Sequence, residues 1–218
     1  SIVSLEIKKL WNIISLEKKR RVEVRGFHYE GRDKLRRKFF STDEYDSLDE
    51  FKSAVERFSL AINEDGFNAY ITLNPIRSDS DSQYASDSDI ELRDLLLIDI
   101  DRAGGTKQPA SESELLKSEL LASEVSQFLH NKGWGEPVRV MSGNGYHLYY
   151  RLDCLPNDND TSHLLKKLLI ILADLFDNDE AKIDRVVYNA SRITKIPGTI
   201  MRKGIESDGR PFRMSRVL

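Results

Sequence analysis

The segment from Arg93 to Asp101, RDLLLIDID, is a continuous apolar run that ends in two carboxylates. Such a run is typical of a strand that is buried on both of its faces. Residues two positions apart in a strand point to the same face, about 6.5–7 Å apart along the chain. Asp99 and Asp101 should therefore share one face, where two carboxylates repel each other unless a cation lies between them. Oxygen ligands of this kind suit Mg²⁺ or Mn²⁺, although an isolated Asp-x-Asp can also simply cap a turn.

Four segments have helical patterns. Apolar residues at helical spacing predict an amphipathic helix over residues 4–19, and another is expected near residues 162–176. Two capping boxes, SLDE at 47–50 and SESE at 111–114, predict helices that run to about residues 63 and 131. The second of these should be ended by Gly133. Its inward-facing residues are expected to be Leu116, Leu120, Val125 and Phe128.

Strand-like segments alternate with these helices. We expect strands at residues 20–27 and 67–73, a hairpin over 138–152 and a mostly extended C-terminal tail. This order predicts an α/β or α+β body around one central sheet. The segment 76–91, IRSDSDSQYASDSDIE, is rich in serine and aspartate. We expect these residues to bury nothing, which predicts a mobile loop.

Composition limits the environment and the class of the protein. The 218 residues suffice for one large domain or two small lobes with a buried core. The single cysteine, Cys154, excludes an intramolecular disulfide and a cysteine-rich zinc site, and it suits a reducing cytoplasm. The longest apolar run, residues 164–176, is too short and too charged to span a bilayer, so we expect no membrane partner.

Charge is unevenly distributed along the chain. Residues 78–101 contain eight acids and one base, whereas residues 182–218 contain nine bases and three acids. The two regions could simply complement each other. The same asymmetry also suits a metal-dependent enzyme that handles polyphosphates.

The hairpin over residues 138–152 has a polar tip, SGNGYH, from Ser142 to His147. Gly143 and Gly145 would allow positive φ and let a phosphate approach the backbone amides closely. The Ser142 hydroxyl and the His147 imidazole would add donors, so the tip, with Asn144, could hold the phosphates of a nucleotide. The alternatives are an ordinary surface hairpin or a Ser–His pair for acyl transfer, but no strand–elbow–helix context surrounds Ser142.

Asp184, in KIDRVV, is a candidate third carboxylate because it lies among apolar residues. Three carboxylates can hold two metal ions about 3.5–4 Å apart, an arrangement used for in-line phosphoryl or nucleotidyl transfer. Basic residues then recur among small residues and turns: Arg192, Lys195, Lys203, Arg210 and Arg213. Bases in such numbers often form only a solvated face, but beside a metal site they would suit a triphosphate and a nucleic-acid backbone.

In combination, these motifs resemble the archaeo-eukaryotic primase superfamily, and most of all bacterial primase-polymerase domains of mobile elements, plasmids and CRISPR-associated systems. The resemblance runs from VEVRGF to the C-terminus, through YITLNP, LLLIDID, SGNGYHLYY, IDRVVYNASRITKIPGT and RKG…RPFR. It implies a single catalytic domain over residues 1–218. This domain would have an N-terminal α/β lobe (about 1–90) and a catalytic lobe with an RNA-recognition-motif-like sheet (about 91–218).

The resemblance also implies site residues. The ligands of a two-metal Mg²⁺ or Mn²⁺ site, without zinc, would be Asp99, Asp101 and Asp184. Nucleotide-binding residues would be Ser142, Gly143, Asn144, Gly145, His147, Arg192 and Lys195. Nucleic-acid contacts would come from Arg25, Lys203, Arg210 and Arg213.

The implied activity is that of a DNA primase-polymerase in the cytoplasm, serving replication, repair or CRISPR-linked DNA synthesis. It would transfer a nucleotide from a (d)NTP to a 3′-hydroxyl or to an initiating nucleotide, with release of pyrophosphate. The implied partners are a single-stranded DNA template, a primer strand and (d)NTPs, with a helicase or a helical accessory domain as a further candidate.

Two positions depart from the family pattern. Many relatives have serine two residues before the motif histidine, where this chain has Gly145. Bacterial relatives often have Arg-Pro-His-Arg near the end, and here Phe212 takes the place of that histidine. A role for its ring nitrogen therefore cannot be transferred to this chain.

Three other functions fit the motifs less well. A toprim-type primase or nuclease also uses Asp-x-Asp, but it needs an upstream catalytic glutamate on its own strand, for which we find no convincing candidate. A nucleotidyltransferase of the polymerase-β type would place Gly-Ser just before Asp-x-Asp, and none is present. A nucleic-acid-binding module without activity should have lost the acids, yet all three are present.

Overall fold

The computed structural model describes residues 2–105 and 107–218 and has an α+β fold. Its strands form two main antiparallel sheets, so the prediction of one central sheet was wrong. The first sheet has the order β2 (Arg36–Ser41), β1 (Arg21–His28), β3 (Phe67–Thr72), β8 (Ile193–Lys195). The second has the order β11 (Arg216–Val217), β5 (Val138–Met141), β6 (Tyr146–Pro156), β4 (Leu92–Arg102), β7 (Ala181–Ile183). Two short strands pair separately, β9 (Ile200–Met201) and β10 (Arg213–Met214).

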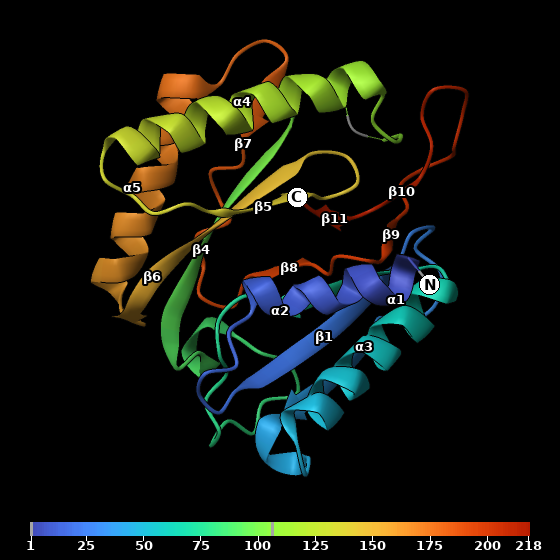
Figure 1. The fold of residues 1–218 in the computed structure, drawn as a ribbon, viewed down its shortest axis with the longest axis vertical. Coiled ribbons are helices and arrows are strands. Elements are labelled where there is room, and N and C mark those ends of the chain that lie inside the picture. Colours follow the sequence, from blue (N-terminus) through green and yellow to red (C-terminus); the bar gives the residue numbers. More distant parts are fainter. Residues whose placement is uncertain (1, 106) are drawn as a thin grey trace.

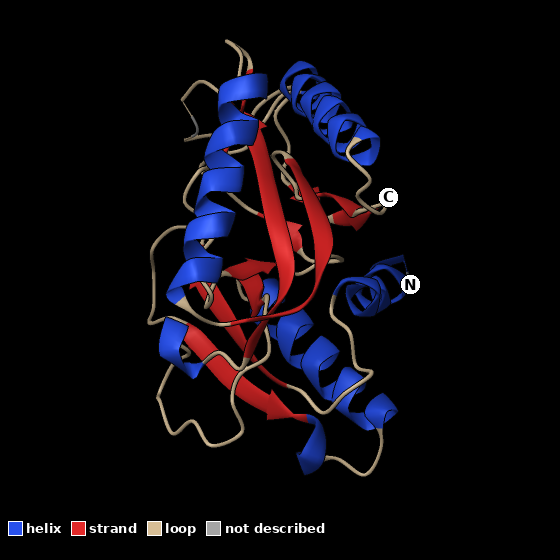
Figure 2. Ribbon diagram, turned by 90° about the vertical axis from the view of Figure 1, so that its left-hand side faces the viewer, coloured by secondary structure: helices blue, strands red, loops and turns tan. Residues whose placement is uncertain are grey.

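The second sheet contains a β-α-β-β-α-β unit of the ferredoxin-like kind. The chain runs through β4, α4 (Glu112–Asn131), β5, β6, α5 (Asn159–Phe176) and β7, and all strand pairs are antiparallel. Both long helices lie on one side of this sheet (Figures 1 and 2). The arrangement agrees with the expected RNA-recognition-motif-like sheet. No helix among the described residues is long and apolar enough to cross a membrane.

Strand β4 is the central element of this sheet, between β6 and β7. Its side chains alternate: Leu96, Ile98 and Ile100 point one way and are buried, and α4 packs against the strand. Leu97, Asp99 and Asp101 point the other way and line a cleft. The predicted strand at residues 93–101 is therefore confirmed, with the acids on its open face.

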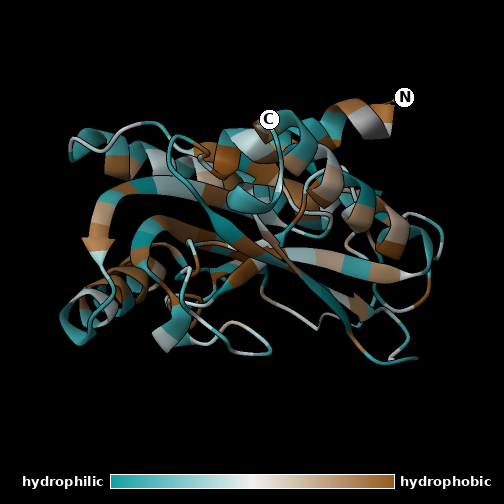
Figure 3. Cartoon of the chain, turned by 90° about the horizontal axis from the view of Figure 1, so that it is seen from below, coloured by the Kyte–Doolittle hydropathy of each residue, from teal (hydrophilic) through white to brown (hydrophobic). Residues whose placement is uncertain are grey.

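The first sheet is covered on one face by α3 (Leu48–Glu64), where Phe51, Val55 and Ile62 are buried. The N-cap of the predicted capping box is present, since the Ser47 side chain accepts a hydrogen bond from the Glu50 amide at 3.1 Å, but Glu50 Oε2 accepts from the Asp46 amide at 3.2 Å and not from the Ser47 amide. In Figure 3, hydrophobic residues are concentrated in the central strands and adjoining helix segments, and peripheral loops are mostly hydrophilic.

The N-terminal helix is shorter than predicted. Instead of one helix over residues 4–19, the structure has α1 (Ile2–Glu6), a 3-10 turn (Ile7–Lys9) and α2 (Leu10–Ile13). Ile14 adopts an extended conformation, with φ −89° and ψ 115°. Leaving the helix there lets Ile13 and Ile14 both be fully buried, and the chain then turns toward β1.

Two further helices differ from prediction in detail. In α4 the buried positions include Leu115, Leu121, Val125 and Leu129, whereas Leu116 and Leu120 are exposed. The expectation was wrong for Leu116 and Leu120, because the small residues Ser118 and Ala122 form part of the inward face; it is confirmed for Val125, and Phe128 is partly buried against the core. Helix α5 begins three residues earlier than expected, because Asp158 caps it by accepting a bond from the Thr161 amide at 2.8 Å.

The segment 76–91 is anchored at several points. Its residues Ile76, Ala85 and Ile90 are buried in a small cluster with Ala190, so the expectation that it buries nothing was wrong. Asp89 accepts hydrogen bonds from the hydroxyls of Ser80, Ser82 and Ser86. The mobility of the loop itself stays a prediction.

The C-terminal tail joins the two sheets. Strand β8 completes the first sheet by pairing with β3, and β11 then pairs with β5 at the edge of the second sheet. The tail is mostly extended, as expected. The prediction divides the chain into two consecutive parts near residue 90. In the structure, β8 adds residues 193–195 to the sheet formed by the N-terminal part.

One carboxylate holds the tail against the start of α4. Glu114 Oε1 accepts hydrogen bonds from Ser111 N at 2.9 Å, Arg102 Nη1 at 3.0 Å and Arg210 Nη1 at 2.6 Å. Burial would raise the pKa of Glu114, but the bonds from Ser111, Arg210 and Arg102 outweigh it and lower the pKa to about 2. Because Arg102 directly follows Asp101, this cluster also fixes the end of β4.

Glu114→Gln should make the free energy of unfolding depend less on pH below about pH 4.5. The native pKa lies below the ordinary value of 4.5, so the contribution of this carboxylate to stability is complete above that pH and is lost as the pH falls toward about 2. Denaturant unfolding at a series of pH values should show lower stability for the variant at neutral pH and a shallower loss over that window. Glu124→Gln, an exposed change on the same helix, should keep the wild-type slope; equal slopes for all three proteins would contradict the assignment.

Candidate active site

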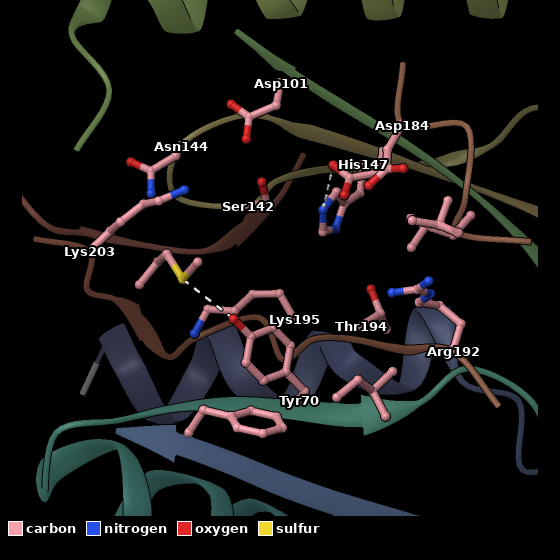
Figure 4. A pocket seen from close by; sticks show the side chains of 16 residues that line it. Tyr70, Asp101, Ser142, Asn144, His147, Asp184, Arg192, Thr194, Lys195 and Lys203 are labelled. Carbon is pink, nitrogen blue, oxygen red and sulfur yellow. Dashed lines mark hydrogen bonds and ion pairs between the residues drawn. The ribbon is translucent and has the colours of Figure 1, made fainter. Parts of the chain in front are cut away.

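A cleft of about 380 Å³ lies between the two sheets and collects most of the predicted site residues (Figure 4). The second sheet supplies one wall: Leu97, Asp99, Asp101, Ser142, Asn144, His147 and Asp184. The first sheet and the tail supply the other: Phe27, Tyr70, Arg192, Ile193, Thr194, Lys195, Met201 and Lys203. Acids on one wall thus face mostly basic and aromatic residues on the other.

The three predicted acids come together through the register of two neighbouring strands. Ile100 pairs with Ile183 and Asp101 with Lys182, and the Asp184 amide donates to the Asp99 carbonyl oxygen at 2.8 Å. Asp184 therefore follows β7 directly beside Asp99, although 85 positions separate the two in the numbering. The carboxylates of all three line the same cleft.

The donor set suits a hard divalent cation. Asp101 Oδ1 accepts from the Arg102 amide and Asp184 Oδ1 from the Val186 amide, while Asp99 Oδ1 lies 3.3 Å from His147 Nε2. Burial, together with the charge of Asp99, raises the pKa of Asp101 and outweighs the opposing effect of Lys203 and Arg102. Within residues 2–105 and 107–218, no three Asp, Glu, His or Cys groups already converge as a metal cluster. The acids thus fit Mg²⁺ or Mn²⁺ because they are oxygen ligands and because all three face the same cleft. They do not by themselves surround a metal position.

The hairpin tip lies on the wall of the cleft that carries the three acids, as predicted. Its glycines, however, serve the backbone conformation and the packing of the hairpin. Gly143 has φ +114°, whereas Gly145 is not in the positive-φ region, so that prediction was wrong for Gly145. A Cβ on Gly145 would overlap the carbonyl oxygen of Ile100, so the absence of a side chain lets the tip pack on β4. The cleft is lined by Ser142, Asn144 and His147 but not by the two glycines. Their role in nucleotide binding stays a prediction.

Asn144 is the polar group of the tip with the clearest orientation. Its Oδ1 accepts from the Ala110 amide at 2.9 Å, which fixes the carboxamide. Its Nδ2 is buried and has no acceptor among the residues that the structure describes. An unpaired buried donor costs free energy, so this NH₂ group suits a ligand oxygen. Figure 4 shows Asn144 next to Lys203 at one end of the cleft, with Arg192 at the other end.

His147 is held within a hydrogen-bonded chain. Its Nε2 faces Asp99, and its Nδ1 lies 3.0 Å from the hydroxyl of Tyr149. The Tyr149 hydroxyl in turn lies 2.5 Å from Thr194 Oγ1 on β8. Burial raises the pKa of Tyr149, so the phenol keeps its proton. This series of hydrogen bonds therefore links the second sheet to the first directly behind the cleft.

Three basic residues of the tail line the cleft. Arg192 is oriented by Asn189 Oδ1 at 2.8 Å and the Val186 carbonyl at 3.1 Å. Lys195 is 2% exposed and donates to Thr199 Oγ1 at 2.7 Å and to the Ile200 carbonyl at 3.3 Å. Burial, with the charge of Arg202, lowers the pKa of Lys195 to about 7. Lys203 projects from the segment after β9.

The other predicted nucleic-acid contacts lie outside this cleft and are engaged within the protein. Arg25 pairs with Glu23 at 2.8 Å and donates to the Ala85 carbonyl. Arg210 is bound to Glu114, and Arg213 pairs with Glu112 at 3.1 Å. These contacts give the three arginines structural partners; their contact with nucleic acid stays a prediction.

Sequence reasoning missed the aromatic and hydroxyl groups of the opposite wall. Phe27 and Tyr70 form an edge-to-face pair with ring centroids 6.0 Å apart, and Phe27 is 43% exposed. Burial and the charge of Asp99 raise the pKa of Tyr70 to about 12. Thr194 was also missed. The pairing of β1 with β3 and of β3 with β8 brings these residues to the cleft, and such pairings leave no local signal in the sequence.

Comparisons with known proteins find solved structures with a similar fold. Neither a protein-family model nor a curated protein matches the chain. The fold is similar to the crystal structure of primase RepB′, with TM-score 0.56, 12% identity, and coverage of 99% of this chain and 56% of that one. It is also similar to the polymerase domain from Mycobacterium tuberculosis ligase D in complex with DNA, with TM-score 0.54, 14% identity, and coverage of 92% and 77%. The chain thus spans little more than half the length of the RepB′ chain. At these identities the likeness establishes the fold alone, which this chain shares with the two structures.

Gly145→Ala should destabilise the protein by about 1–3 kcal/mol, since the added methyl group would overlap backbone of β4 and force it to move. Gly135→Ala is the matched control, because a Cβ there meets open space and its φ is not positive. Denaturant unfolding of both variants would measure the difference. Equal stability of the two variants would show that β4 does not approach the hairpin tip as described.

Proposed function

We propose that this chain is a catalytic domain of the archaeo-eukaryotic primase superfamily that performs template-directed nucleotidyl transfer. A 3′-hydroxyl, or that of an initiating nucleotide, would attack the α-phosphorus of a (d)NTP and release pyrophosphate. The observation that carries the proposal is the convergence of Asp99, Asp101 and Asp184 on one cleft. The cleft belongs to a fold shared with a primase and with a polymerase domain bound to DNA.

The opposite charges of the two walls suit this chemistry. Asp99, Asp101 and Asp184 would hold two Mg²⁺ or Mn²⁺ ions, and such ions lower the pKa of an attacking hydroxyl and offset the charge of departing pyrophosphate. Phosphoryl chemistry otherwise depends on placement and on charge neutralisation, which protein groups can provide. The chain's donors on the two sides of the cleft would position the triphosphate.

Each end of the cleft has its own donors. Asn144 Nδ2, fixed through Ala110, and Lys203 beside it would hold phosphate oxygens at one end. Arg192 at the other end would contact a second phosphate, of the triphosphate or of a nucleic-acid strand. Phe27 and Tyr70 would together supply an apolar surface against which a base or a sugar packs.

We further propose that the partners are a single-stranded DNA template, a primer and (d)NTPs. The support is the likeness of the fold to a polymerase domain whose structure is in complex with DNA. Replication, repair and CRISPR-linked synthesis remain the proposed settings, with a helicase or a helical accessory domain as a candidate partner. Unprimed and primed single-stranded DNA, supplied with labelled ribo- and deoxynucleotides, would test the activity and identify its products.

Asp99→Asn, Asp101→Asn and Asp184→Asn should each reduce primer extension by at least roughly 100-fold, because even changes outside the ligand shell of a metal cost roughly 10- to 100-fold. Each change preserves shape and removes one charge. Asp179→Asn, an exposed change of the same type, should leave extension unaltered. Extension in Mg²⁺ or Mn²⁺ at the wild-type rate by any of the three variants would refute the metal assignment.

Lys203→Ala should raise the KM for the nucleotide by roughly 10- to 150-fold and change kcat little, since a bond from a charged donor contributes about 1.5–3 kcal/mol and acts mainly on the bound phosphate. Steady-state extension over a range of nucleotide concentrations would separate the two constants. Lys167→Ala on the exposed side of α5 is the control. A lowered kcat with an unchanged KM would place Lys203 at another step.

A further inference from the structure

Tyr149 was not among the residues that the sequence indicated, yet it is the group in contact with the inner nitrogen of His147. The two residues are two positions apart on β6 and lie on the same face, with Nδ1 and the hydroxyl 3.0 Å apart. Tyr149 is 2% exposed, and its ring meets the imidazole edge to face with centroids 5.9 Å apart. The imidazole is therefore fixed on its inner side by a buried phenol.

The direction of the hydrogen bonds follows from the groups at the two ends of the chain. An ionised carboxylate only accepts hydrogen bonds, so the contact of Asp99 Oδ1 with His147 Nε2 at 3.3 Å requires the proton on Nε2. In a neutral imidazole Nδ1 is then the acceptor, which makes the Tyr149 hydroxyl the donor to it. The same hydroxyl oxygen can accept from Thr194 Oγ1, which lies 2.5 Å away. If the hydrogen bonds ran in the opposite direction, the lone pair of Nε2 would face the Asp99 carboxylate, and the two would repel each other.

We propose that Tyr149 is a positioning residue that holds the His147 ring by donating to Nδ1, so that the N–H of the Nε2–H tautomer, which the contact with Asp99 selects, is directed into the cleft. Thr194 completes the arrangement from β8, so a strand of the first sheet supports a side chain of the second. His147 would then act as a fixed hydrogen-bond donor to an anionic ligand oxygen, and it could not serve as the base that accepts the proton of an attacking hydroxyl. The ligand part of this inference rests on the proposed function; the tautomer does not.

The tautomer can be measured on the protein without any ligand. Long-range ¹H–¹⁵N correlation spectra distinguish the two neutral tautomers of an imidazole, and the chain has only 4 histidines, so His147→Ala identifies the signals. The wild-type protein should show a protonated Nε2 and an unprotonated Nδ1 at a pH where the ring is neutral. A protonated Nδ1 in the wild type overturns the inference, and the tautomer itself is read from the wild-type protein, with His147→Ala needed only to assign its signals.

Tyr149→Phe removes the donor and keeps the ring. It should keep the Nε2–H tautomer, which Asp99 still selects, but shift the Nδ1 signal of His147 and weaken the binding of a non-hydrolysable deoxynucleoside triphosphate by roughly 5- to 10-fold. Thr194→Val should keep the wild-type Nδ1 signal, because Tyr149 can still donate to Nδ1. Tyr150→Phe is the matched control, since that neighbouring hydroxyl is buried without a hydrogen-bond partner among the described residues and lies outside this cleft; it should change neither the spectrum nor the affinity.

Two outcomes separate this inference from the proposed function. If Tyr149→Phe keeps the wild-type Nδ1 signal and full affinity, Tyr149 does not position the ring and the inference fails, whether or not the chain transfers nucleotides. If the Nδ1 signal shifts as expected but the wild-type protein binds no nucleoside triphosphate, the positioning role stands and the proposed function fails.

Discussion

The antiparallel register around β4 is the constraint on which the site depends. Pairing with β6 sets Asp99 opposite His147, and pairing with β7 brings Asp184 beside Asp99. The alternation of the strand then places Leu97, Asp99 and Asp101 together on the face away from the helices. A shift of one residue in either pairing would turn the partner side chains to the other face. The long apolar run of β4 fixes the register, because its other face must be buried under α4.

The cleft is a joint product of both sheets. Acids and the hairpin tip come from the second sheet, while Tyr70, Thr194 and Lys195 come from β3 and β8 of the first. The tail makes this arrangement by entering the first sheet as β8 and returning to the second as β11. Its arginines at 210 and 213 are engaged by glutamates at the start of α4, so the basic character of the tail serves its attachment as well as the cleft. Charge counts along the sequence could not separate these two uses.

The sequence predicted the local elements well where local physical rules decide them. Caps at Ser47 and Ser111, the strand ending in Asp99 and Asp101, and the hairpin with a polar tip are all present. It was less successful where the environment decides. The inward face of α4 was placed on Leu116 and Leu120, because Ser118 and Ala122 do not stand out as core residues. The serine- and aspartate-rich segment was expected to bury nothing, because hydrogen bonds among its own side chains and a small apolar cluster with Ala190 are not visible in composition.

By itself, the sequence determined which functional groups are available for a site: three carboxylates on or beside apolar strands, a histidine in a tight turn and a basic tail. Those are properties of residue type and of short-range periodicity, which a single sequence contains. Only the tertiary structure decided which of these groups meet. Pairing between strands distant along the chain selected Lys203, Arg192 and Asn144 for the cleft and left Arg25, Arg210 and Arg213 to internal ion pairs. It also brought Tyr149 behind His147 and Thr194 behind Tyr149, because contact across two sheets depends on register and packing, which no local pattern specifies.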